Sequence, residues 1–202
     1  MDDGSADQGR TEKIATENNC IYLKYEPNRG KGAAIRTGML SARGAYRIFT
    51  DADIPYETEA IDTFLKYLDF KEFHMVVGDR TLGSLGYFAE VNRMRSAASK
   101  TFAFIVGRFI AGGMFDTQCG IKGFRADIAK DIFSVSRING FAFDVEIFYI
   151  ALKRNYDIKR LPVKLRSQDG KSVSLIKNSI FMLLDIPKIV YYYYFGKYNQ
   201  KV

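Results

Sequence analysis

Two aspartates, Asp51 and Asp53, directly follow the apolar segment 46–50, which has the composition of a strand. Residues two apart on an extended chain point the same way, so both carboxylates are expected on one side of a crevice at the strand end. Mg²⁺ and Mn²⁺ prefer oxygen ligands, and Mg²⁺ often uses one or two carboxylates together with substrate phosphates. This D-x-D pattern is common by chance, but its place after a strand favours a site for metal and phosphate.

Basic residues that could hold phosphate occur at two places along the chain. The sequence GKG at 30–32 opens an expected helix, whose free amides and dipole attract anions, although a plain helix-starting turn explains it as well. Arg80, Arg93 and Arg95 follow a third apolar strand, and arginine suits bidentate contacts with phosphate. These residues are candidate phosphate ligands.

Two further segments carry polar residues in apolar surroundings. Residues 116–124 are rich in glycine and polar side chains, as a loop that lines a substrate requires. Asp144 and Glu146 lie among aromatic residues at 141–146. Asp144 suits either a helix N-cap or a catalytic acid, and both interpretations stay open.

The elements that must position these residues alternate along the chain. Apolar spacing predicts strands at 21–25, 46–50, 75–78, 121–124 and 158–163, and helices at 33–42, 58–68, 91–110, 127–133 and 145–154. Thr58 is a plausible N-cap for the second helix. Such alternation predicts an α/β layered domain with a largely parallel sheet.

Composition limits the classes of function. The chain has 202 residues, 47% of them hydrophobic, which suits one domain with a buried core. A net charge of +7 fits nucleic acid, an anionic membrane or a phosphorylated substrate. The basic residues are scattered, often beside glycine or serine, which favours local phosphate contacts, so no nucleic-acid partner is expected. A basic surface that serves only solubility is the alternative.

The cysteine and hydropathy patterns bear on the cellular compartment, and the histidine content bears on the type of site. Cys20 and Cys119 are widely spaced without a CxxC motif, which favours a reducing, cytoplasmic setting. His74 is the single histidine, which disfavours a zinc site or a Ser-His-Asp triad. No signal peptide is expected at the start of the chain, and no segment reaches the roughly 20 apolar residues that span a bilayer.

The first residues hold an acidic cluster, with Asp2 and Asp3 followed by glycine and serine. Such residues usually lie at the C-terminal end of a strand, where ligands bind, yet no strand precedes them. One interpretation is an N-terminal tail with a cap before a helix at 11–18. The other is that an upstream strand is missing.

Together these motifs resemble family 2 glycosyltransferases, most of all the branch of dolichyl-phosphate glucose synthases and polyprenyl-phosphate glycosyltransferases. Five motifs occur in the family's order: DDGS-x-D at 2–7, N-x-GKG-x-A at 28–34, DAD at 51–53, DTQCG-x-K at 116–122 and FAFDVE at 141–146. The resemblance implies a single GT-A (Rossmann-like) α/β domain with a mostly parallel mixed sheet. The family normally begins with a further strand, a Pro-x-Tyr-Asn-Glu loop and a helix, so the chain is expected to be truncated at its N-terminus.

The resemblance also implies roles for individual residues. Asp2, Asp3, Lys31 and Asp51 are expected to bind the nucleotide sugar, and Asp53 to hold Mg²⁺ or Mn²⁺ at the diphosphate. The candidate ligands for phosphate and acceptor are Arg80, Arg93, Arg95, Gln118 and Arg166. Some relatives carry a polar residue two positions after the D-x-D, where this chain has Pro55.

The implied reaction is inverting, metal-dependent transfer of a hexose, with UDP-glucose the expected donor and a polyprenyl or dolichyl phosphate the acceptor. A phosphate monoester with a second pKa near ~6 is already nucleophilic at neutral pH and needs no dedicated base. A transferase that acts on a sugar hydroxyl would need one, with Asp116 the first candidate. An inactive fragment of such an enzyme is the remaining alternative.

The chain is divided into a catalytic domain at 1–170 and an amphipathic helical tail at 171–202. The tail mixes apolar residues and tyrosines with flanking lysines, which suits an interfacial segment. Peripheral contact with the cytoplasmic face of a membrane is therefore expected. Packing of the tail on the domain, or on a second subunit in a homo-oligomer, is the alternative.

Overall fold

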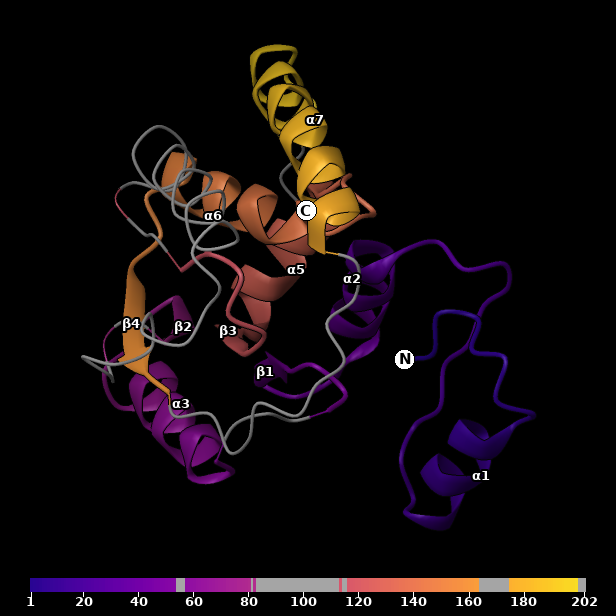
Figure 1. The fold of residues 1–202 in the computed structure, drawn as a ribbon. Coiled ribbons are helices and arrows are strands. Elements are labelled where there is room, and N and C mark those ends of the chain that lie inside the picture. The colour runs from indigo at the N-terminus through magenta and orange to yellow at the C-terminus, as the bar shows by residue number, and fades with distance from the viewer. Residues whose placement is uncertain (54–56, 81, 83–112, 114–115, 164–174, 200–202) are drawn as a thin grey trace.

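One mixed sheet forms the centre of the molecule (Figure 1). The computed structural model describes residues 1–53, 57–80, 82, 113, 116–163 and 175–199. In this part of the chain four strands lie in the order β1-β3-β2-β4: β1 (Tyr46–Phe49), β2 (Met75–Asp79), β3 (Lys122–Arg125) and β4 (Ile158–Pro162).

The strand directions correct one expectation. β2 and β4 pair in parallel, but β3 lies antiparallel to both β1 and β2. The α/β class and the mixed sheet are confirmed, while the expected majority of parallel pairings is wrong for the described strands. The reason is that β3 enters the sheet between β1 and β2 in the opposite direction, which no local sequence pattern specifies.

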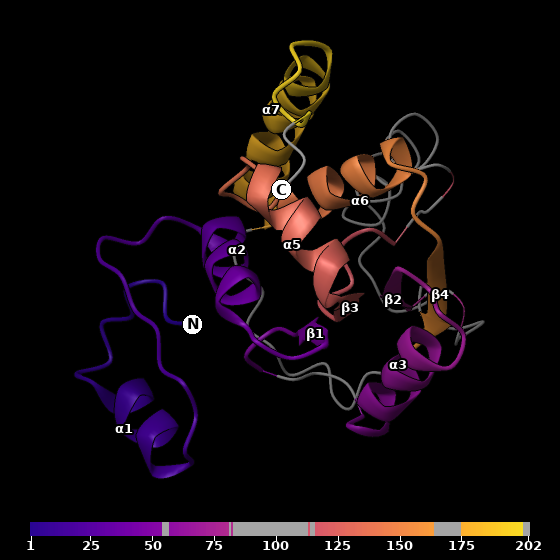
Figure 2. The ribbon, with the colours of Figure 1, turned by 180° about the vertical axis from the view of Figure 1, so that it is seen from behind.

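Helices cover both faces of the sheet (Figures 1 and 2). One face packs against α3 (Glu59–Asp69), and the other against α2 (Lys31–Ser41), α5 (Ala126–Val135) and α6 (Phe143–Lys153). Side chains alternate along the strands, so Met75 and Val77 join the core of the α2-α5-α6 side and Val76 joins that of the α3 side. The result is three layers.

Helix positions largely follow the sequence expectations. α2, α3, α5 and α6 each overlap their expected ranges and differ by no more than a few residues at their ends. Thr58 occupies the N-cap position of α3, but its side chain makes no capping hydrogen bond. The expected helix at 91–110 lies outside the described residues.

The N-terminal segment lies apart from the sheet (Figures 1 and 2). It contains α1 (Arg10–Glu17), which overlaps the expected helix at 11–18 and buries none of its residues. The strand expected at 21–25 is absent from the described elements, since this stretch makes only an isolated parallel bridge between Asp2 and Lys24. A single bridge is too little pairing to form a strand.

The chain ends in the helix α7 (Leu175–Tyr194), which packs on α6. Ile189 is fully buried in the larger core, and the rings of Tyr149 and Tyr193 meet edge to face at 5.5 Å. Within the described residues, no helix combines the length and the apolar composition needed to cross a membrane. The interfacial role of the tail stays a prediction.

Candidate active site

Asp51 lies two residues after the end of β1 and is held between a glycine and a lysine. Its amide donates to the carbonyl oxygen of Gly120 at 3.2 Å, and its carboxylate lies so close to Gly120 that a Cβ there would collide with it. The Lys31 ammonium lies 2.5 Å from Asp51 Oδ1. The structure therefore brings together Asp51 and Lys31, two of the expected donor-binding residues.

Asp53 differs from Asp51 in being exposed. It makes no hydrogen bond or ion pair with the other described residues. Among those residues no cluster of three or more His, Cys, Asp or Glu could hold a metal by itself. Two carboxylates that share a cation with substrate phosphates would suit Mg²⁺ chemistry.

The start of α2 is occupied by protein groups. Gly30 has φ 102°, a conformation that favours glycine, and a Cβ on Gly32 would collide with the carbonyl oxygen of Ile138. The amides of Gly32 and Ala33 both donate to the carbonyl oxygen of Asn139. These two amides are therefore paired within the protein, and the expectation of a bound anion at this helix start stays a prediction.

Asp3 lies at the turn just before α2. It accepts hydrogen bonds from the amides of Arg29 and Gly30 at 2.8 and 2.9 Å. Asp2 is buried elsewhere and accepts from the Ser5 amide and the Tyr22 hydroxyl, which lower its pKa to about 2. Both aspartates thus have protein partners, and only Asp3 lies next to the turn that carries Lys31.

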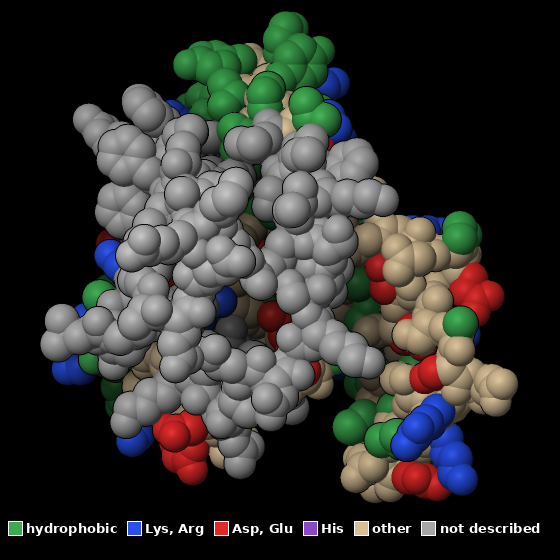
Figure 3. Space-filling model, in the orientation of Figure 1, with side chains coloured by type: hydrophobic (Ala, Val, Ile, Leu, Met, Phe, Trp, Pro, Cys, Tyr) green, Lys and Arg blue, Asp and Glu red, His purple; other side chains and the backbone are tan. Residues whose placement is uncertain are grey.

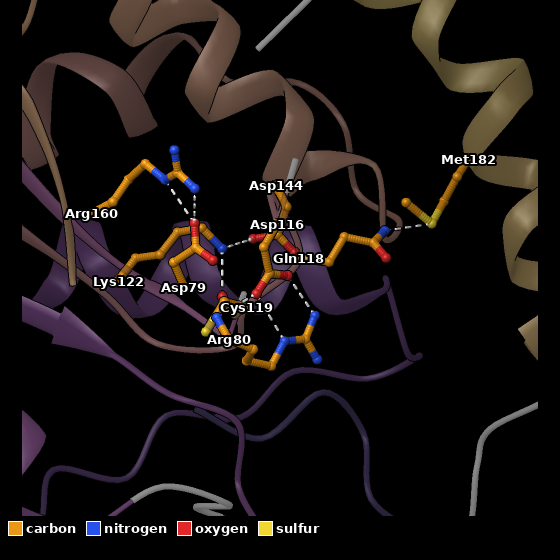
Figure 4. A network of polar contacts seen from close by, with 9 residues as sticks. All are labelled: Asp79, Arg80, Asp116, Gln118, Cys119, Lys122, Asp144, Arg160 and Met182. Atoms are coloured by element: carbon orange, nitrogen blue, oxygen red, sulfur yellow. Dashed lines mark hydrogen bonds and ion pairs between the residues drawn. The ribbon is translucent and has the colours of Figure 1, made fainter. Parts of the chain in front are cut away.

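Arg80 and Asp116 form a bidentate ion pair at the C-terminal end of β2 (Figure 4). Arg80 Nε and Nη2 lie 3.0 and 2.6 Å from the two carboxylate oxygens, and the Arg80 amide donates to the same group. Burial alone would raise the pKa of Asp116, but the hydrogen bonds and charge of Arg80 outweigh it and lower that pKa. Such a carboxylate is a poor proton acceptor and a good anchor for a guanidinium.

The other expected ligands are only partly described. The Gln118 amide lies 3.0 Å from Met182 Sδ in α7, so this side chain links the 116–120 loop to the C-terminal helix. Arg93, Arg95 and Arg166 lie outside the described residues.

Two ion pairs beside the Arg80–Asp116 pair were not anticipated from the sequence (Figure 4). Arg160 Nη2 on β4 lies 2.5 Å from the buried Asp79 carboxylate on β2. Lys122 at the start of β3 is fully buried and lies 2.5 Å from Asp144 Oδ1. A lysine or arginine inside an apolar strand is a usable signal, because a charge that faces a core needs a partner.

The acidic pair at 144–146 has structural partners. Asp144 pairs with Lys122, and burial raises its pKa against the opposing charge of that lysine. Glu146 accepts hydrogen bonds from the Arg137 and Ile138 amides and from the Tyr198 hydroxyl. Neither is the side-chain cap of α6, whose N-cap position is Ala142.

Comparisons with known proteins place the chain in a family. A family model described as "Glycosyl transferase family 2" matches residues 1–133. The chain is 32% identical to a dolichyl-phosphate beta-glucosyltransferase of Dictyostelium discoideum, over all of the chain and 64% of that protein. The same name is carried by a Saccharomyces cerevisiae relative, 29% identical over 99% of the chain and 66% of its own length. A Homo sapiens relative of that name is 30% identical over 86% and 56%.

Solved structures show the same fold. Glucosyl-3-phosphoglycerate synthase of Mycobacterium tuberculosis, crystallised with Mn²⁺, UDP and its product, matches with a TM-score of 0.63 at 14% identity, over 94% of this chain and 67% of that one. Mannosyl-3-phosphoglycerate synthase of Rubrobacter xylanophilus matches with a TM-score of 0.60 at 16% identity, over 92% and 60%. The chain spans between 56% and 66% of the length of the three curated relatives above.

Proposed function

The chain belongs to glycosyl transferase family 2, and from that premise we propose that it transfers glucose from UDP-glucose to dolichyl phosphate or a similar polyprenyl phosphate. The observation that carries the proposal is the end of β1, where Asp51 is fixed by Lys31 and Gly120 while Asp53 is exposed. A carboxylate held in place beside an open one suits a donor that brings both a ribose and a diphosphate.

The described residues fit a divalent cation at this place. Asp53 would hold Mg²⁺ or Mn²⁺ together with oxygens of the donor diphosphate, because its carboxylate has no partner among the described residues. The cation would neutralise negative charge on the leaving diphosphate. Lys31, fixed by Asp51, adds a positive charge on the same side.

The acceptor is better explained as a phosphate than as a sugar hydroxyl. A phosphate monoester is largely ionised at neutral pH and can attack the anomeric carbon directly. The new bond forms between its oxygen and that carbon as the bond to the diphosphate breaks, which inverts the configuration. Asp116, the candidate base for a hydroxyl acceptor, has a lowered pKa and both oxygens engaged by Arg80.

A membrane-facing tail would bring the lipid acceptor to the site. On α7 and just after it, Leu184, Tyr191, Tyr194 and Phe195 are exposed. Figure 3 shows hydrophobic side chains gathered at this end of the molecule. We therefore propose peripheral membrane contact through 171–202, with the catalytic domain at 1–170.

The test is donor-dependent labelling of a lipid phosphate. Incubation with labelled UDP-glucose, Mn²⁺ and dolichyl phosphate should yield a lipid-linked sugar, and Asp53→Ala should lower the rate roughly 100-fold because several kcal/mol of charge stabilisation are lost. Asp62→Ala, at an exposed acid in α3, is the matched control and should keep the wild-type rate. Normal turnover by Asp53→Ala would refute the metal role, and labelling of free sugar acceptors alone would favour hydroxyl transfer.

A further inference from the structure

Lys122 places an ammonium group in the fully buried interior of the described residues. The side chain is fully buried between the rings of Phe49 and Phe148, at 5.5 and 5.7 Å from their centroids. Its Nζ donates to Asp144 Oδ1 at 2.5 Å and to the carbonyl oxygen of Cys119 at 2.7 Å. This lysine has no role in the reaction proposed above.

The second of these hydrogen bonds leads directly to the donor site. Cys119 precedes Gly120, whose carbonyl oxygen accepts from the Asp51 amide and whose Cα lies against the Asp51 carboxylate. One peptide therefore connects the anchored carbonyl to the contact that fixes Asp51. A shift of this turn would move Asp51 away from Lys31.

The charge of Lys122 also acts on Asp116, the acidic residue of the 116–120 loop. Burial raises the pKa of Asp116, and against it act Arg80 and, more weakly, Lys122. The 116–120 loop is thus held at Asp116 by Arg80 and at Cys119 by Lys122 (Figure 4).

Fold stability alone does not explain the pair. Replacing a buried ion pair with well-packed apolar residues is often neutral or stabilising, because removing two charges from water costs several kcal/mol for each. The surroundings of Lys122 include the aromatic rings of Phe49 and Phe148, which would accept an apolar side chain. The presence of a charged residue at position 122 therefore needs an explanation other than fold stability, and the hydrogen bond from Lys122 to Cys119 supplies one.

We propose that Lys122 is a positioning residue, which holds the Cys119–Gly120 turn so that Asp51 is fixed before the donor binds. The expected effect on donor binding rests on the function proposed above. The anchoring of the turn by Lys122 does not. Lys122 itself touches no substrate in this scheme, so it acts through Gly120 and Asp51.

The first test replaces both charges in the full chain, with Lys122→Met/Asp144→Leu, so that no unpaired carboxylate stays buried. We expect a melting temperature close to the wild type, while the Kd for UDP with Mn²⁺ in calorimetry rises about tenfold or more, as for other supporting contacts. Asp144→Glu is the control that keeps a carboxylate beside Lys122, and with it the link from Lys122 to Cys119, so its Kd should stay within about threefold. Wild-type affinity in the double variant would overturn the proposal, and so would loss of folding, since the pair would then serve the fold.

The second test needs no donor, so it separates this proposal from the proposed function. Cys119 is buried and reduced, and Cys20→Ser removes the exposed thiol. In that background the double replacement should speed the reaction of Cys119 with a thiol reagent about tenfold or more, since a freed turn opens more often. An unchanged rate would refute the anchor. A wild-type chain that fails to bind UDP would instead count against the proposed function.

Discussion

At the scale of single residues, many acidic side chains near the strand ends already have a basic or amide partner. Asp79, Asp116 and Asp144 pair with Arg160, Arg80 and Lys122 in that order. Asp53 stands out because it is exposed and has no partner among the described residues. This contrast supports the proposal that Asp53 binds the cation, a distinction that the D-x-D spacing does not provide.

The ionised form of Asp2 should stabilise the fold in a pH-dependent way. Hydrogen bonds from Tyr22 and Ser5 lower its pKa from 3.8 to about 2. On acidification the unfolded chain takes up this proton first, so the contribution is complete above pH 3.8 and is lost as the pH falls toward about 2. The Asp2→Asn variant should therefore have a lower Tm than the wild type at neutral pH. Its Tm should also decline less steeply as the pH falls from 3.8 to about 2.

Tyr22→Phe is the matched variant, because it keeps the carboxylate and removes its largest stabilising contact. The pKa of Asp2, measured by NMR of its carboxyl carbon, should move toward 3.8 in this variant. Parallel Tm curves for wild type and Asp2→Asn between these pH values would contradict the assignment.

The sequence allowed single residues to be found but seldom their partners. The position of Asp51 after a strand follows from a local motif, but its ion pair with Lys31 does not. The pairs Arg80–Asp116 and Lys122–Asp144 join residues far apart in the chain, and only the packed sheet brings them together. Partner choice at such distances depends on tertiary geometry, which spacing along the chain does not encode.

At the scale of elements, α2 is fixed by close backbone contact at its start. Gly32 lies against the carbonyl oxygen of Ile138 and the Cβ of Phe143. Of the described residues, Gly38 in the same helix has only the Cβ of Met1 nearby, at 3.6 Å from an ideal Cβ. The two glycines therefore differ in what a methyl group would meet. Because Lys31 is the first residue of α2, the packing that fixes the helix start also fixes the position of Lys31.

Alanine at these two positions should have opposite effects. Gly32→Ala should lower the free energy of unfolding by about 1–3 kcal/mol, because the new methyl overpacks a contact with backbone. Gly38→Ala should raise it by about 0.5–1 kcal/mol, since alanine loses less conformational entropy in a helix. Urea unfolding measures both, and equal changes of the same sign would show that the start of α2 is not tightly seated.

The elements themselves were largely predictable, and their directions were not. The helix at 127–133 was expected from apolar spacing, and α5 occupies Ala126–Val135. The direction of β3 could not be read in this way, because a four-residue strand has the same alternation in either direction. The strand expected at 21–25 has the right composition, but its backbone makes only one bridge.

At the scale of the whole molecule, α7 joins the core on one side and meets solvent on the other. Ile189 and Tyr198 are buried, and the Tyr198 hydroxyl donates to Glu146 at 2.7 Å. Leu184, Tyr194 and Phe195 are exposed on the same segment. The tail is thus attached to the domain, and its exposed side chains keep a fixed direction relative to the candidate site.

This arrangement predicts that the exposed aromatics bind lipid without supporting the fold. Tyr194→Ser/Phe195→Ser should lower partitioning onto vesicles of phosphatidylcholine and phosphatidylserine at least tenfold, because each aromatic that leaves water contributes about 1.5–3 kcal/mol when fully buried. The free energy of unfolding should hardly change, since both side chains already meet solvent. Cosedimentation and urea unfolding measure the two quantities on the same samples.

The control must remove equally exposed apolar residues from a part of the molecule that lies away from α7. Ile14→Ser/Ile21→Ser does so, since these side chains are 51% and 74% exposed on the N-terminal segment. If vesicle binding falls as much in this control, the interaction is a general property of exposed apolar groups and the tail has no special role. If only the tail variant loses binding, the helix that reaches the core through Ile189 also meets the membrane, and a lipid phosphate can be delivered to a site at a fixed distance from the bilayer surface.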